Sequence, residues 1–233
     1  MTSPRKTLNY LTRESCAEPT LVRNVVEFYN LVADEYGDRN THCFTAAMRD
    51  AEEHHTREFL KGRSFETALD MGCGDGNFLL YVLAVKKIGL DFSIEMIKRH
   101  RRQLRSATYL LADCRKQLVL QNSSVDIVHC SFVLDHIDGV DAFLKEVSRI
   151  LNEQGVFLLS LYSPKGILER RPYRESFEYR TRSGKSLLVP SNFEALLNLN
   201  EKLEILFRVV GYEQIPTATI NSCSIDYYVL HKR

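Results

Sequence analysis

The sequence predicts an α/β fold in which helices cover both faces of a mostly parallel β-sheet. Apolar, strand-like runs alternate with helical patterns along the middle of the chain, which is typical of parallel sheets. The first run ends in a glycine-rich loop and the second ends in an acid, as in nucleotide-binding α/β folds. Strands are expected near 66–71, 86–91, 107–112, 125–131 and 155–162, with helices near 77–84, 94–105 and 140–151.

The segments after the fifth predicted strand indicate an insertion and two closing strands. Residues 176–189 alternate in polarity around a Ser-Gly turn, a pattern that predicts a β-hairpin. A helix is expected near 192–209, with its end at Gly211. The last two strands of a seven-stranded sheet are expected at 212–219 and 225–231.

Two amphipathic helices are predicted ahead of the glycine-rich loop. The first ends at Gly37, and the second runs from a Thr41 cap to Gly62. One face of the first helix consists of Val22, Val25, Tyr29, Val32 and Tyr36. An apolar stripe on the second consists of Phe44, Met48, Ala51, His55 and Phe59. His54 is expected to face water.

His55 has two interpretations. A single histidine on an apolar stripe is more often a hydrogen-bonded core residue, and we favour that interpretation. If the helix lined a pocket for a reacting molecule, the same imidazole would be placed as a general base.

Composition indicates one globular domain without a special partner. The chain has 233 residues, 44% of them hydrophobic, and a formal net charge of +1, so no overall charge attracts nucleic acid or an anionic membrane. Its six cysteines form no C-x-x-C pair, which argues against a zinc site or a disulfide framework. With no signal-like or membrane-spanning apolar run, a cytoplasmic protein is expected.

The glycine-rich loop is the strongest sign of ligand binding. Gly72 and Gly74 can take positive φ and let a ligand approach the backbone, and a helix is expected to follow them. Asp91 lies nineteen residues after Gly72, where an acid at the end of the next strand suits a ribose diol. The spacing is G-x-G-x-G instead of the dinucleotide pattern G-x-G-x-x-G, so NAD is disfavoured.

The strings Leu-Asp-Met-Gly-Cys-Gly-Asp-Gly at 69–76 and Gly-Leu-Asp-Phe-Ser-Ile-Glu-Met-Ile at 89–97 strongly resemble the class I S-adenosylmethionine-dependent methyltransferases. The resemblance is to the small-molecule branch of that family, of the methyltransferase type 11 kind, and covers roughly residues 65–162. It implies a Rossmann-like fold, a helical lid at 1–64, a cofactor-binding core at 65–162, a substrate-cap hairpin at 163–190, and a last helix and strands at 191–233.

The resemblance also implies a set of residues for S-adenosylmethionine. The loop Asp70, Gly72, Cys73 and Gly74 would hold the methionine end, and Asp91 the ribose. Asp113 would accept from the adenine amino group, with the amide of Cys114 beside it. Phe92 and Met96 would wall the adenine, Ser131 would face the sulfonium, and Tyr29 would cover the cofactor from the lid. Any one of these acids alone could equally be a helix cap or a solvated turn residue.

Two further residues are candidates for catalysis. His136 follows the fourth predicted strand, at the sheet edge where ligands bind in open α/β folds, and it matches a recurrent family histidine. It could act as a general base or as a structural hydrogen-bonding residue, and Asp135 beside it could be a helix cap. Tyr36 is expected near the transferred methyl group, although it and Tyr29 could simply fill the core.

The implied reaction is methyl transfer from S-adenosylmethionine to an N or O nucleophile of a small molecule. In-line displacement needs mainly alignment of the reactants, which is worth up to ~7–11 kcal/mol, so a base is optional. An RNA- or protein-directed methyltransferase and a catalytically silent cofactor-binding scaffold stay open as alternatives. No metal is expected, because Asp126, Asp135 and Asp138 do not match the metal triad of catechol-type enzymes.

The acceptor site is predicted where three segments meet at the cofactor edge. These are the 131–138 loop, the N-terminal lid and the 163–190 insertion. The basic cluster Arg170–Arg174 is placed at the mouth of this site, where it would suit an anionic acceptor or form a solvated loop.

Overall fold

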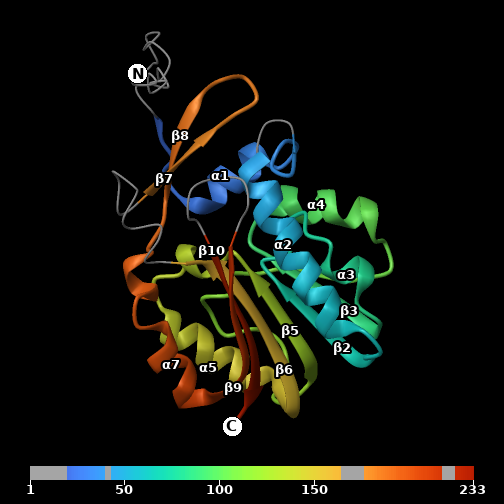
Figure 1. Cartoon of the computed structure of the whole chain (residues 1–233). Helices are drawn as coiled ribbons and strands as arrows, with labels where there is room; N and C mark the ends of the chain where they lie inside the picture. Colours follow the sequence, from blue (N-terminus) through green and yellow to red (C-terminus); the bar gives the residue numbers. More distant parts are fainter. Residues whose placement is uncertain (1–19, 40–42, 164–175, 217–223) are drawn as a thin grey trace, which may run out of the picture.

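A seven-stranded sheet forms the centre of the molecule in a computed structural model that describes residues 20–39, 43–163, 176–216 and 224–233 (Figure 1). The strand order is β4-β3-β2-β5-β6-β10-β9; the first five strands are parallel, and β10 runs antiparallel to both of its neighbours, β6 and β9. The strands are β2 (Phe65–Met71), β3 (Ala84–Asp91), β4 (Thr108–Leu111), β5 (Val125–Ser131), β6 (Leu151–Tyr162), β9 (Phe207–Pro216) and β10 (Ser224–Lys232). The predicted α/β class and mostly parallel sheet are therefore confirmed.

Helices cover both faces of this sheet (Figure 1). One face carries α2 (Cys43–Leu60), α3 (Phe78–Tyr81) and α4 (Ile94–Gln103), and the other carries α5 (Val140–Ile150) and α7 (Leu199–Leu206). The central strands are apolar on both sides for this reason. In β5, Ile127 packs toward α3 while Val128 and Cys130 pack toward α5.

A second, smaller sheet lies above the carboxyl ends of the parallel strands (Figure 1). The hairpin predicted at 176–189 is present as β7 (Ser176–Arg180) and β8 (Ser186–Pro190), and the short β1 (Thr20–Leu21) adds to β8 in parallel. The helix α1 (Val25–Val32) packs on this sheet through Phe28, Val32, Tyr179, Leu187 and Val189. We call β1, α1, β7 and β8 together the cap.

The first helix is shorter than the apolar spacing predicted. Asn24 caps its start by accepting a hydrogen bond from Glu27 N at 2.9 Å, so Val22 lies outside the helix, although it is buried. The helix ends at Val32, and Tyr36 follows in a turn. The second helix ends close to Gly62 as expected, where φ is +71°, but Thr41 lies outside the described residues.

The predicted helix at 192–209 was wrong at both ends. A short 3-10 turn (Glu194–Leu196) precedes α7, and the chain turns into β9 at Phe207, since a run of aromatic and β-branched residues pairs there with β10. Gly211 is therefore no helix end. It lies within β9 opposite Val229, whose Cβ would be 3.4 Å from a Cβ built at this glycine.

Candidate functional site

The glycine-rich loop joins β2 to α3 and is fixed to the neighbouring strand. Gly72 has φ +72° and Gly74 has φ +45°, the left-handed region that favours glycine. The amides of Gly72 and Cys73 both donate to the Leu90 carbonyl of β3, at 2.7 and 2.9 Å. A Cβ at Gly72 would lie 2.4 Å from Val133 Cγ2, so the loop after β5 approaches this backbone closely. The following helix is α3, only four residues long.

Asp91 braces the loop from the end of β3. Its Oδ2 accepts a hydrogen bond from Gly74 N and its Oδ1 accepts one from Ser93 N, each at 2.8 Å. The side chain is buried, and this burial raises the pKa of Asp91 to about 6 against the opposing effect of those amides. Hydroxyl donors or a positive charge on a ligand in the cavity would stabilise the ionised form of such a buried acid.

A cavity of about 280 Å³ lies at the carboxyl edge of the parallel strands, and we call it the loop cavity. The structure brings ten of the predicted site residues together in its lining. They are Tyr29, Tyr36, Asp70, Gly72, Cys73, Gly74, Asp91, Phe92, Ser131 and His136. Arg49 and Glu52 of α2 also line it, so residues from α1, α2 and the carboxyl ends of β2, β3 and β5 meet at one place.

An adjacent cavity of about 490 Å³ contains the remaining predicted polar residues, Asp113 and Cys114. Phe92, Val133 and His136 line both cavities, so the two are neighbours. The Asp113 carboxylate is bound by the Arg115 side chain through two hydrogen bonds of 2.8 Å, which lower the pKa of Asp113. Met96, by contrast, is fully buried and lines neither cavity, so the structure does not bring it to the site.

His136 is held between the cap and the sheet. Its Nδ1 lies 3.1 Å from the Pro190 carbonyl, which can only accept, so Nδ1 carries the proton. Its Nε2 lies 3.0 Å from the Tyr29 hydroxyl and, in that neutral tautomer, accepts the hydroxyl hydrogen. Asp135 Oδ2 is 3.7 Å from the same nitrogen. Burial raises the pKa of Tyr29 well above its usual range, so the phenol stays protonated.

Tyr36 lies beside this pair, with its ring centroid 5.2 Å from that of Tyr29. Arg49 of α2 lies over the Tyr36 ring at 5.9 Å and forms an ion pair of 2.9 Å with Asp75 of the glycine-rich loop. A Cβ at Gly37 would lie 2.2 Å from Asp75 Oδ2, so the chain after α1 also approaches the loop closely. Arg49 and Asp75 were not predicted as site residues, because nothing local in the sequence indicates that they meet.

A second contact missed from the sequence joins α2 to the sheet. His129 of β5 is buried, with Nδ1 2.7 Å from Asp70 Oδ1 and Nε2 2.9 Å from Glu52 Oε1. The Phe78 ring stacks on the imidazole, with centroids 4.4 Å apart. Burial alone would lower the pKa of His129, but the two carboxylates raise it to about 10. The available signal was a histidine within the otherwise apolar run 127–130 of β5.

The other histidines and the basic cluster give a mixed result. His54 is exposed as predicted. His55 donates from Nδ1 to the Ala51 carbonyl at 2.9 Å, and its Nε2 lies 3.3 Å from Glu213 Oε2, outside both cavities. That position fits the structural interpretation of His55. The cluster Arg170–Arg174 lies outside the described residues.

Two general features of the described part of the chain bear on the class of protein. No helix there is long and apolar enough to cross a membrane. Within the same residues, no three histidine, cysteine or acidic side chains form a group suited to a metal ion. The expectation of a metal-free reaction stays a prediction.

Comparison with known families finds that residues 69–159 match the model of a methyltransferase domain of the type 11 kind. The matched segment runs from the end of β2 to β6 and so contains the glycine-rich loop, Asp91, Asp113 and His136. The cap and α2 lie outside it.

Curated relatives match over similar, partial stretches. The chain is 30% identical over 94 residues to a malonyl-[acyl-carrier protein] O-methyltransferase of Hamiltonella defensa, covering 40% of this chain and 36% of that protein. It is 27% identical over 145 residues to a demethylmenaquinone methyltransferase of Leptospira interrogans, covering 58% of each. The chain thus spans about a third to three fifths of the length of these relatives.

Solved structures match over more of the chain. The PH0226 protein of Pyrococcus horikoshii superimposes with a TM-score of 0.67 at 19% identity, covering 88% of this chain and 99% of that one. A complex of DhpI with SAH gives a TM-score of 0.65 at 18% identity, covering 89% and 94%. These similarities establish the fold.

Proposed function

We propose that the chain transfers a methyl group from S-adenosylmethionine to an N or O nucleophile of a small molecule, because residues 69–159 match the model of a methyltransferase domain of the type 11 kind. The observation that supports this most directly is the loop cavity, which places the predicted cofactor residues next to the Tyr29–His136 hydrogen bond. The relatives named above act on an acyl-carrier conjugate and on a demethylmenaquinone, so methylation of a small molecule or its carrier-bound form has precedent among similar chains.

The residues at the edge of the sheet fit this cofactor. The loop is a cradle in which side chains at Gly72 or Gly74 would be strained, and the acids Asp70 and Asp91 line the cavity beside it. A buried acidic lining suits a ligand that carries a sulfonium and an ammonium group. Asp113 and the Cys114 amide in the adjacent cavity suit an adenine edge, provided that Asp113 shares its carboxylate with Arg115.

When bound, S-adenosylmethionine would supply an electrophilic methyl carbon to the lone pair of the acceptor, and the electron pair of the broken carbon–sulfur bond would stay on sulfur. The protein must then align the acceptor and receive the proton that an oxygen or nitrogen acceptor loses. Aromatic side chains of Tyr29, Tyr36 and Phe132 line the cavity and provide flat apolar walls for that alignment.

The proton leaves through Tyr29 and His136. The His136 imidazole is not itself open to an acceptor, since its Nε2 is engaged by the Tyr29 hydroxyl and its Nδ1 by the Pro190 carbonyl. The acceptor proton therefore passes to the Tyr29 oxygen while the Tyr29 hydrogen passes to His136 Nε2. The resulting imidazolium is stabilised by Asp135, whose Oδ1 has no hydrogen-bond partner among the described residues. His136 is then a base that acts through Tyr29.

The acceptor enters beneath the cap. The hairpin of β7 and β8 packs on α1, and just after it the Asn192 backbone amide donates to the Asp135 carbonyl at 2.6 Å, which supports an acceptor site at the carboxyl edge of the sheet. An anionic acceptor stays a prediction, because Arg170–Arg174 lie outside the described residues and Arg49 in the cavity is already paired with Asp75.

Donor binding and acceptor class can be tested together. S-adenosylmethionine at 100 times its dissociation constant should stabilise the fold by ~2.7 kcal/mol, whereas NAD should leave the thermal melt unchanged. Incubation with methyl-labelled donor and fractionated cell extract should then put the label into low-mass products. Label in RNA or protein would favour the macromolecular alternative, and donor binding without any labelled product would favour the silent scaffold. A melt that moves with NAD alone would refute the assignment.

A further inference from the structure

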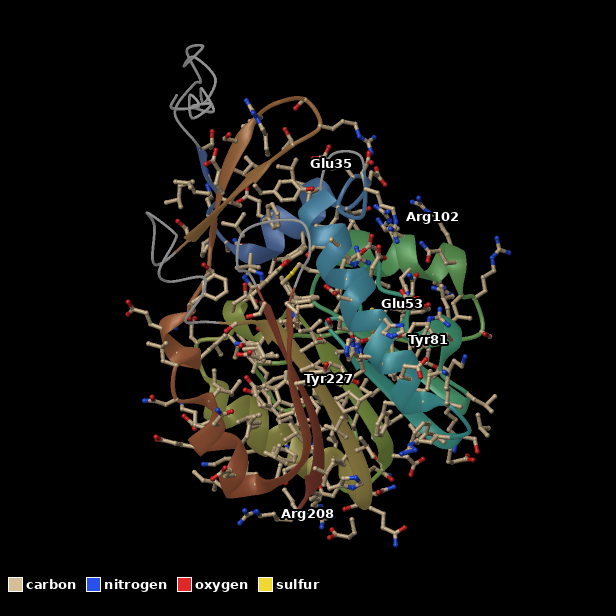
Figure 2. All side chains as sticks on the ribbon, in the orientation of Figure 1. Glu35, Glu53, Tyr81, Arg102, Arg208 and Tyr227 are labelled. Atoms are coloured by element: carbon tan, nitrogen blue, oxygen red, sulfur yellow. The ribbon has the colours of Figure 1, made fainter. Side chains whose placement is uncertain are left out.

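The Glu52–His129–Asp70 network lies in the loop cavity and has no part in the proton path. Its three side chains come from α2, β5 and β2, and each is more than nine-tenths buried. The neighbouring Glu53 of α2, labelled in Figure 2, accepts a hydrogen bond from Asn77 Nδ2 at 3.0 Å just before α3. Asp70 and His129 are paired positions of neighbouring parallel strands, so their side chains leave the same face of the sheet. Thr56 of α2 fixes Glu52 by donating to Oε1 at 2.6 Å.

The geometry sets the charge of the network. Each ring nitrogen of His129 faces a carboxylate oxygen at 2.7 or 2.9 Å, and an ionised carboxylate can only accept. Both nitrogens therefore carry hydrogen, and the imidazole is cationic. Two carboxylates and one imidazolium leave the network with one net negative charge in a buried setting, where charge interacts strongly with a ligand.

The network also presents unused acceptor atoms at the site. Neither Glu52 Oε2 nor Asp70 Oδ2 accepts a hydrogen bond from any residue in the described part of the chain, and both residues line the cavity. His129 lies two residues before Ser131 on the same face of β5, and Asp70 lies two residues before Gly72. The negative charge is thus centred on the part of the cavity assigned to the methionine end and sulfonium.

We propose that this network makes the donor site charge-selective, so that it favours the cationic methylsulfonium over the uncharged thioether product. The proposal rests on the proposed function, because it takes S-adenosylmethionine as the donor. His129 is a positioning residue that holds both carboxylates. Glu52 supplies the net negative charge, because the Asp70 carboxylate alone would be balanced by the imidazolium. Methyl transfer removes the positive charge from sulfur, and the product then loses part of its attraction to the site.

The test compares the dissociation constants of S-adenosylmethionine and S-adenosylhomocysteine by calorimetry. Glu52→Gln keeps the shape of the side chain and its contacts with Thr56 and His129 but removes the charge. We expect it to lower the preference for the donor about tenfold, equivalent to about 1.4 kcal/mol, mainly by weakening donor binding. Glu52→Asp should keep most of the preference. Glu58→Gln is the matched control, because Glu58 is an exposed residue of the same helix paired with Lys61.

The outcomes separate a charge effect from a structural one. If Glu52→Gln weakens both ligands equally, or if Glu52→Asp loses as much preference as Glu52→Gln, the network serves only to hold α2 and the proposal is overturned. Should Glu52→Gln not fold, the wild-type protein can be given sinefungin, in which an ammonium replaces the methylsulfonium. It should bind about tenfold tighter than S-adenosylhomocysteine, and equal binding overturns the proposal. A wild-type protein that binds none of these ligands refutes the donor assignment itself.

Discussion

The glycine-rich loop and the cap meet at the same cavity, but different kinds of contact hold them. The loop is fixed by backbone hydrogen bonds to the adjacent strand, such as those from Gly72 and Cys73 to Leu90. The cap is fixed by side chains that reach across the sequence, as Tyr29 does to His136. The first kind of contact follows from local sequence and strand order, and the second depends on the packing of the whole chain. Donor binding and acceptor chemistry should therefore be separable by mutation.

The largest separation is expected at Tyr29. Tyr29→Phe removes the hydroxyl through which the acceptor proton reaches His136, and loss of such acid–base assistance typically costs ~10²–10⁴-fold in rate for a hydroxyl acceptor. The kcat should fall by that order while donor affinity changes little. His136→Gln should lose as much, and the double variant no more, because the two residues act as one path. Undiminished turnover in His136→Gln would show that the histidine is structural.

The second contrast uses two glycines with positive φ. Gly184 in the hairpin has φ +83°, and a Cβ at this position would have nothing within 4 Å, so Gly184→Ala should cost only the backbone strain of roughly 1–2 kcal/mol. Gly72→Ala carries the same strain plus a contact of 2.4 Å with Val133, which adds roughly 1–3 kcal/mol. Urea unfolding of both variants measures the difference. Equal losses would mean that the loop after β5 can move away from the glycine.

The third prediction concerns pH and Asp91. Burial raises its pKa to about 6, so between roughly pH 4 and 6 the folded protein retains a proton that the unfolded chain, with a pKa of about 3.9, has lost. Stability without ligand should therefore decline as the pH rises through that window. Donor affinity should change in the opposite direction and improve up to about tenfold per pH unit below 6, since the ribose site needs the ionised form.

Asp91→Asn is the control for this behaviour. The substitution should abolish the part of each pH dependence, in stability and in donor affinity, that is due to Asp91. Near neutral pH, where wild-type Asp91 is ionised, it should weaken donor binding roughly tenfold or more. Calorimetry and urea unfolding at matched pH values would measure the two effects. A variant that keeps wild-type donor affinity would show that Asp91 only braces Gly74.

The smallest effect is expected in the cap. Asn24→Ala removes the side-chain acceptor at the start of α1 and should cost about 1 kcal/mol of stability, whereas Asn24→Ser should retain most of it. Limited proteolysis of the cap and urea unfolding report the loss. Donor affinity should stay constant, and a parallel loss of donor binding would show that the cap and the loop are not separable.

The same division explains what could be predicted from the sequence. The loop glycines and Asp91 were predictable because spacing along adjacent parallel strands determines where they lie. The Tyr29 and His136 positions were expected at the site, but the hydrogen bond that makes one act through the other joins residues 107 apart. Glu52 and His129 were missed because a buried charge network has no periodic signature. The helix end predicted at Gly211 was wrong, because glycine occurs within strands as well as at helix ends.

The Pro190 carbonyl gives the hairpin a direct influence on acid–base chemistry. It lies at the end of β8 and is the acceptor that keeps the His136 proton on Nδ1. If β8 moves away, that acceptor is lost, and the imidazole is free to place its proton on Nε2, where it would face the Tyr29 oxygen and no longer accept from it. Whether His136 can take up a proton from the methyl acceptor through Tyr29 thus depends on the position of β8. The chemical shift of His136 Nδ1 would report whether the hairpin is in the position described here.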